Sequence, residues 1–142
     1  MGVEEKVREI KKEFFAYRNG ILADRLRDAG YPYRIIFGLN VPQLAELARL
    51  CGYDMDLADA LWSDRGVRES RLLACYLFDP EKIDAEEAFR LACDVATAEE
   101  ADMLSFRLLK RLPYVSDLYG RLSGSDSENA FLAARSLARH LE

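Results

Sequence analysis

The sequence has few of the residues from which metal sites and nucleophilic sites are usually built. It contains one histidine, His140, which excludes any site that needs two histidine ligands, such as an H-E-x-x-H metalloenzyme. A Ser–His or Cys–His pair would require His140 to be held rigidly close to the chain end. The cysteines Cys51, Cys75 and Cys93 are odd in number, widely spaced and set in apolar helical patterns. We therefore expect buried, reduced thiols of a cytoplasmic protein rather than a metal or redox site.

Long hydrophobic runs and phosphate-binding loops are also missing. No apolar run approaches the roughly 20 residues that cross a bilayer, and the opening residues MGVEEKVREIKKE contain no hydrophobic stretch of the kind found in a secretory signal. Neither a P-loop nor a G-x-G-x-x-G turn occurs, and the acidic residues around position 84 do not follow the EF-hand pattern. These absences predict a cytoplasmic protein with no membrane segment, metal or cofactor.

Charge is abundant but unevenly distributed along the 142 residues. Charged residues make up 32% and hydrophobic residues 50% of the chain, which is typical of a soluble globular protein. The length predicts a single domain over 1–142. The net charge is −5, and residues 79–103 hold nine acidic but only two basic side chains. A simple whole-surface nucleic-acid binder would be basic. Any contact with nucleic acid would therefore have to come from a local patch.

The remaining pattern is helical from end to end. Residues 3–17 and 21–29 have apolar residues at helical spacing. Later helices are expected to start near residues 41, 56, 67, 84, 98, 115 and 126. Asn40 with Gln43, Thr97 with Glu100, and Ser125 with Glu128 have the spacing of capping boxes, and Asp54 or Asp56 and then Asp84 are further cap candidates. Short turns of Gly, Pro and Asp separate the helices.

One helix is expected at the centre of the fold. It begins with charged residues near Val67 and is wholly apolar over 72–78, as a buried helix would be. Residues 34–38 have strand-like propensity but no partner strand, which indicates a buried connector. Several helix starts recur at a spacing of roughly 30 residues, which is typical of stacked helix hairpins. We predict an all-α fold, an α-α superhelix of the HEAT/ARM-like solenoid type, with a compact helical bundle as the alternative.

A stretch in the first half of the chain carries a family resemblance. Residues 38–48, GLNVPQLAELA, resemble the G-x-x-x-P-x-L-x-x-L-A stretch of the bacterial DNA alkylation repair family. Leu61-Trp62 and the run from Val67 to Ala74 are similar to that family's next two helices. The resemblance extends over about residues 35–141. It implies a HEAT-like repeat fold, and the best-known members of the family are DNA glycosylases that act on alkylated purines.

The segments that match the family's catalytic motifs lack the family's functional side chains. The family places a Trp-Asp-x-x-Asp motif at a helix start, and the matching residues here are 101–105, ADMLS, with Ser105 at the position of the catalytic carboxylate. Asp102 is retained and is the one weak catalytic candidate. A later motif supplies an arginine, and the matching position is Ala134, with Arg135 displaced by one. A serine cannot stabilise a forming oxocarbenium ion as a carboxylate does. The resemblance therefore implies a relative that is not an enzyme, or, if it is one, a DNA glycosylase.

Two basic clusters are candidates for contacts with a DNA backbone. The first surrounds the start of the central helix, and the second lies near the end of the helix that begins at 98. Their members are Arg65, Arg68 and Arg71, and then Arg107, Lys110 and Arg111. On a solenoid rim these side chains would contact phosphates. Alternatively, Arg68 and Arg71 form surface ion pairs, while the second cluster stabilises the carboxyl end of a helix dipole.

Three functions follow from these patterns. The first is a non-catalytic DNA-alkylation-repair-like module that binds duplex DNA or a protein. The second is an active glycosylase that excises alkylated purines through a rearranged site. The third is a protein-interaction scaffold with no nucleic-acid role. DNA binding without release of a purine would support the first function, release of an alkylated purine would support the second, and neither result would support the third.

Overall fold

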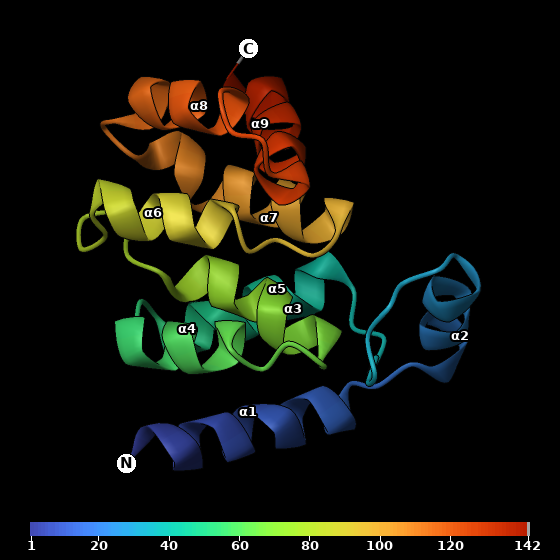
Figure 1. Ribbon diagram of the computed structural model, residues 1–142. Helices are drawn as coiled ribbons and strands as arrows, with labels where there is room; N and C mark the ends of the chain where they lie inside the picture. Colours follow the sequence, from blue (N-terminus) through green and yellow to red (C-terminus); the bar gives the residue numbers. More distant parts are fainter. Residues whose placement is uncertain (142) are drawn as a thin grey trace. The chain divides into compact units, whose positions relative to one another are not determined.

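The computed structural model describes residues 1–141, and within them the chain is helical, without β-strands. Its extended backbone forms one isolated parallel bridge, between Ile35 and Val67, in that part of the chain. The prediction of an all-α protein is confirmed (Figure 1). The elements are α1 (Val3–Ala16), α2 (Gly20–Asp28), α3 (Val41–Cys51), α4 (Met55–Trp62), α5 (Arg68–Leu77), α6 (Ala85–Ala92), α7 (Ala98–Arg107), the 3-10 helix η1 (Leu109–Arg111), α8 (Val115–Ser123) and α9 (Glu128–Leu141).

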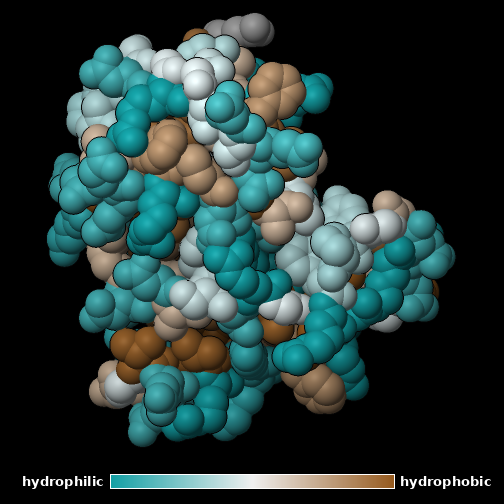
Figure 2. Space-filling view, viewed as in Figure 1, coloured by the Kyte–Doolittle hydropathy of each residue, from teal (hydrophilic) through white to brown (hydrophobic). Residues whose placement is uncertain are grey.

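The helices group into two units, Met1–Leu77 and Phe78–Glu142. In unit 1, α5 packs against both α3 and α4, and α4 also packs against α1. Figure 2 shows a hydrophobic strip along the seam between α1 and α4, with mostly hydrophilic side chains over the neighbouring surface. In unit 2, α9 packs against α7 and α8, and α6 packs against α8. Each unit thus has its own set of helix contacts.

Local capping places most helix starts where the sequence predicts them. Asn40 and Gln43 form a complete capping box at α3, and the side chains of Asp54, Asp84 and Thr97 each accept a backbone N–H in the first turn of α4, α6 and α7. The last helix differs from the prediction. The Ser127 hydroxyl, rather than that of Ser125, accepts the N–H three residues on, so α9 begins at Glu128.

The prediction of a buried central helix is confirmed in unit 1. The apolar residues of α5 are fully buried, and so is most of its charged first turn, including Arg68 and Glu69. A helix surrounded by protein on all sides must satisfy its charged groups internally, because no water reaches them. The charged start of α5 is therefore part of the core, which the sequence pattern does not reveal.

Backbone contacts join the residue before α2 to the connector that follows α2. Figure 1 shows α2 standing to one side of α1, α3, α4 and α5. The Asn19 N–H donates to the carbonyl of Phe37 at 2.8 Å, so the chain before α2 and the chain after it meet at this point. Gly38 has φ +90°, and a Cβ there would collide with the Asn19 carbonyl oxygen. Only glycine fits this crossing, because both the backbone conformation and the close approach exclude a side chain.

The cysteine prediction is only partly right. All three thiols are free, but Cys51 is exposed, whereas Cys75 is buried and Cys93 is half-buried. Cys51 is the last residue of α3, where the apolar stripe runs past the edge of the packed surface. In residues 1–141 no three His, Cys, Asp or Glu side chains gather as a metal ion would require. The helices of this part of the chain are also too short or too polar to cross a membrane.

Candidate nucleic-acid interface

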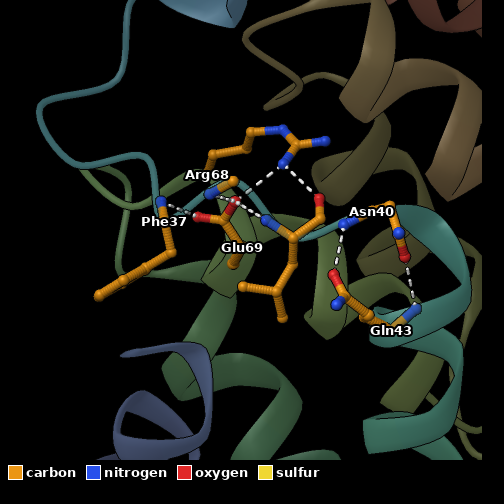
Figure 3. Close-up of polar contacts among 7 residues, drawn as sticks. Phe37, Asn40, Gln43, Arg68 and Glu69 are labelled. Atoms are coloured by element: carbon orange, nitrogen blue, oxygen red, sulfur yellow. Dashed lines mark hydrogen bonds and ion pairs between the residues drawn. The ribbon is translucent and has the colours of Figure 1, made fainter. Parts of the chain in front are cut away.

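Arg68, a member of the first predicted basic cluster, lies beside the buried carboxylate of Glu69 (Figure 3). Glu69 is fully buried, and its carboxylate accepts the backbone N–H groups of Phe37, Gly38 and Leu39 at 2.9, 3.0 and 3.3 Å. Arg68 donates from Nη1 to Glu69 at 2.8 Å and to the Leu39 carbonyl at 2.9 Å. These bonds attach the connector to the first turn of α5. They compensate the charge that Glu69 brings into the core.

The Arg71 guanidinium also contacts groups of the protein rather than solvent. Its guanidinium lies 3.6 Å from the centre of the Trp62 ring and donates to the Trp62 carbonyl at 2.7 Å. Arg68 and Arg71 are 3% and 1% exposed. This burial corrects the expectation that both lie on an exposed rim, because a phosphate cannot reach either guanidinium in this conformation. Arg65, in the turn before α5, is exposed.

The second basic cluster lies on unit 2, around an exposed aromatic ring. Phe106 near the end of α7 has the Lys110 Nζ 3.9 Å from its ring centre and the Arg107 guanidinium carbon 5.0 Å from it. The His140 ring from α9 approaches Phe106 to 5.3 Å between centroids. Arg107 and Lys110 are therefore brought together as predicted, and Arg111 is exposed in η1.

Asp102 links α7 to the last turns of α9. Its Oδ1 lies 2.7 Å from His140 Nε2 and 3.6 Å from an Arg139 Nη. Arg139 also donates to the Ser136 hydroxyl at 3.2 Å. Asp102, Phe106 and Lys110 are spaced four residues apart, so they follow one side of α7 and η1. The carboxylate offsets part of the positive charge at this surface and fixes the histidine ring.

A groove continues this surface between α8 and α9. Phe131, Arg135 and Arg139 are also spaced by four and share one face of α9. Together with Tyr119 of α8 they line a groove of about 520 Å³. The Arg135 guanidinium carbon lies 6.0 Å from the centre of the Phe131 ring. Within residues 1–141 neither Lys110 nor Arg135 forms an ion pair, so both cations are available to an anion.

Ser105 occupies the position where the resemblance places a catalytic carboxylate. It is fully buried, and its hydroxyl has no hydrogen-bond partner among residues 1–141. It therefore faces the interior of unit 2 rather than a substrate. Asp102 is the nearest carboxylate in sequence, but it is engaged by His140 and Arg139. This arrangement can bind an anion through its cations, and it offers no unengaged carboxylate at the motif.

The sequence did not assign several residues of this surface to a DNA-binding site. His140, Arg139, Arg135 and Phe131 all come from α9, whose polar face the apolar pattern treats only as solvent-exposed. The spacing of four between 131, 135 and 139 is the signal that places an aromatic and two cations on one face. Their proximity to α7 depends on packing, which the sequence does not show.

No family model, curated protein or solved structure matches this chain. The function is therefore argued from the geometry of the described residues.

Proposed function

We propose that this protein is a non-catalytic helical-repeat module, similar to the DNA alkylation repair family, that binds the phosphate backbone of DNA through unit 2. The observation that carries the proposal is the gathering of Lys110, Arg135 and Arg139 on the surface formed by α7, η1 and α9. Lysine and arginine side chains that neutralise phosphates supply most of the sequence-independent affinity of such proteins. We call this set of three cations the basic face.

The order of helix contacts supports a HEAT-like arrangement. Contacts between α3 and α5, between α6 and α8, and between α7 and α9 pair each helix with the next but one in the chain. Stacked helix hairpins produce this pattern, because equivalent helices of successive hairpins form a layer. The helix starts recur at roughly 30 residues, as such repeats require. Both features favour a superhelix over a bundle in which only sequential helices meet.

We propose a non-catalytic protein because of the state of Ser105 and Asp102. Glycosidic cleavage requires a carboxylate beside the developing positive charge. The Ser105 hydroxyl is buried, and the Asp102 carboxylate is already paired with His140 at 2.7 Å. We expect no release of alkylated purines from duplex DNA at a rate above background.

The test is binding of a fluorescent DNA duplex by the full chain at about 50 mM salt, where phosphate contacts are strongest. We expect measurable binding, which Lys110→Glu and Arg135→Glu each weaken, because they replace attraction to phosphate with repulsion. Lys12→Glu is the matched control, since Lys12 is an exposed cation of α1 in unit 1. It should leave the affinity largely unchanged.

Three outcomes contradict the proposal. Failure of the wild-type chain to bind at this salt concentration favours a protein-interaction scaffold. Equal losses in the control and in the two unit 2 variants would show that only net charge matters. Release of an alkylated purine that Asp102→Asn abolishes would establish the glycosylase alternative instead.

A further inference from the structure

The basic face carries aromatic rings that a duplex backbone binder does not need. Tyr119, Phe106 and Phe131 are 36%, 37% and 57% exposed, and all three lie beside cations of the basic face. Exposed apolar side chains that gather in one patch rimmed by polar residues mark an interaction site. Paired DNA bases are stacked on each other and do not present their flat faces to a protein surface.

The rings and cations form one continuous series of contacts. Tyr119, Phe131, Arg135 and Arg139 line the same groove. Arg139 reaches Asp102, Asp102 binds His140, and His140 packs on Phe106, which Lys110 covers. We call this series the aromatic track. It begins in the groove between α8 and α9 and ends at η1, entirely within unit 2.

We propose that the ligand of the aromatic track is a single-stranded nucleic acid, an inference that rests on the proposed function. Proteins that bind single strands combine cations that follow the backbone with aromatic rings on which bases stack. Here Phe131 and Tyr119 serve as the stacking rings, and Lys110, Arg135 and Arg139 bind the phosphates. The more exposed Phe131 is the principal platform, because Lys110 already lies over the Phe106 ring.

The charges around the track agree with an extended anionic ligand. Lys110 and Arg135 form no ion pair within residues 1–141, and they lie toward opposite ends of the track. Asp102 lies between them, and its charge is offset by Arg139, while its Oδ1 also contacts His140 Nε2. Beyond Phe131, a second hollow is lined by Asp126 and Glu128. Their negative charge would repel a phosphate, so the aromatic track ends there. An acidic peptide would meet the same cations but would not require open ring faces.

The experiment compares labelled strands of about 12 nucleotides, a length within the usual site sizes of such proteins. Oligo-dT, oligo-U and a DNA duplex of equal length are titrated with the full chain while fluorescence anisotropy is measured. We expect tighter binding of a single strand than of the duplex. Oligo-dT and oligo-U distinguish DNA from RNA as the source of the single strand.

The decisive variant is Phe131→Ala. Loss of one stacked base should weaken single-strand binding by about 5- to 150-fold and change duplex binding much less. Phe15→Ala is the matched control, because Phe15 is 55% exposed and also lies beside an arginine, Arg18, but belongs to unit 1. Its single-strand affinity should equal that of the wild type. Circular dichroism confirms that both variants are folded.

The outcomes separate this inference from the proposed function. Duplex binding with no preference for a single strand overturns the inference and leaves the proposed function intact. The inference is also overturned if Phe131→Ala binds oligo-dT and oligo-U as tightly as the wild type does. It is overturned as well if Phe15→Ala loses as much single-strand affinity as Phe131→Ala. Binding of no nucleic acid at all overturns both.

Discussion

At the residue scale, Glu69 is the side chain on which the connector of unit 1 depends. Its carboxylate accepts three backbone N–H groups and pairs with Arg68, and the carboxylate is fully buried. Glu69→Gln keeps the shape but places an amide NH₂ against backbone donors and removes the negative charge that pairs with Arg68. We expect a loss of about 3 kcal/mol in the free energy of unfolding, measured by urea denaturation.

The control for this change is another Glu→Gln substitution at an exposed ion pair. Glu46 on α3 pairs with Arg49 at 2.6 Å, and its side chain is 54% exposed. Glu46→Gln should hardly shift the urea midpoint, because water replaces the lost contact. Similar losses in both variants would show that the buried network does not contribute more than a surface pair.

At the element scale, the start of α4 combines a cap with an ion pair from α1. Asp54 accepts the Leu57 N–H at 3.1 Å and the Lys6 ammonium at 2.8 Å. The Lys6 hydrogen bond is the main cause that lowers the pKa of Asp54, and the Leu57 N–H adds to it against the opposing effect of burial. The same pair raises the pKa of Lys6, first through the hydrogen bond and then through Asp54's charge.

The pH dependence of this contact has a definite sign. A carboxyl group with a lowered pKa stabilises the fold above its unfolded pKa of about 3.9, and this contribution is lost as the pH falls through the lower folded value. We expect Asp54→Ala to lower the unfolding free energy by about 1 kcal/mol at neutral pH, as loss of a helix cap does. The difference from the wild type should disappear in strong acid, as measured by denaturation across pH.

Lys6→Met separates the ion pair from the cap. This variant retains the Leu57 hydrogen bond to Asp54 but loses the cation that most lowers the pKa of Asp54. Its stability should therefore fall by less than that of the wild type as the pH drops below the unfolded pKa of about 3.9, because the folded pKa of Asp54 is then closer to the unfolded one. Identical acid profiles for Lys6→Met and the wild type would contradict the assignment. At the alkaline end, the raised pKa of Lys6 contributes stability below about 10.4 that is lost as pH rises through the folded value.

At the scale of the whole molecule, a net charge of −5 is combined with the basic face of unit 2. Binding to DNA must then depend on a few local cations, and counterion release gives each phosphate contact a characteristic salt dependence. With Lys110, Arg135 and Arg139 engaged, a plot of log affinity against log salt concentration should have a slope of about −3 for a duplex.

Removal of one cation should reduce this slope in a measurable way. Lys110→Ala is expected to make the slope shallower by about one unit, because one phosphate contact is lost. Anisotropy titrations over a range of salt concentrations measure both slopes. An unchanged slope would exclude Lys110 from the interface, and affinity that does not fall with salt would contradict phosphate binding altogether.

The sequence by itself determined the all-α character and most helix boundaries. Asn40, Asp54, Asp84 and Thr97 act on backbone groups within three residues, so their effect depends little on the rest of the chain. Burial of the 72–78 run, in which only Tyr76 is half-buried, follows equally directly from its apolar composition. These features are local, which is why a linear pattern predicts them.

The tertiary structure alone decided which charged side chains face water. The basic residues at the start of α5 and those around the end of α7 and η1 look alike in the sequence, yet Arg68 and Arg71 are buried while Lys110 reaches the surface. Arg68 donates to the Leu39 carbonyl, 29 residues earlier in the chain, and Arg71 donates to the Trp62 carbonyl at the end of α4. The meeting of Asp102 with His140 likewise joins residues 38 positions apart. Such partners are selected by helix packing, because a periodic pattern specifies the face of a helix but not what lies against it.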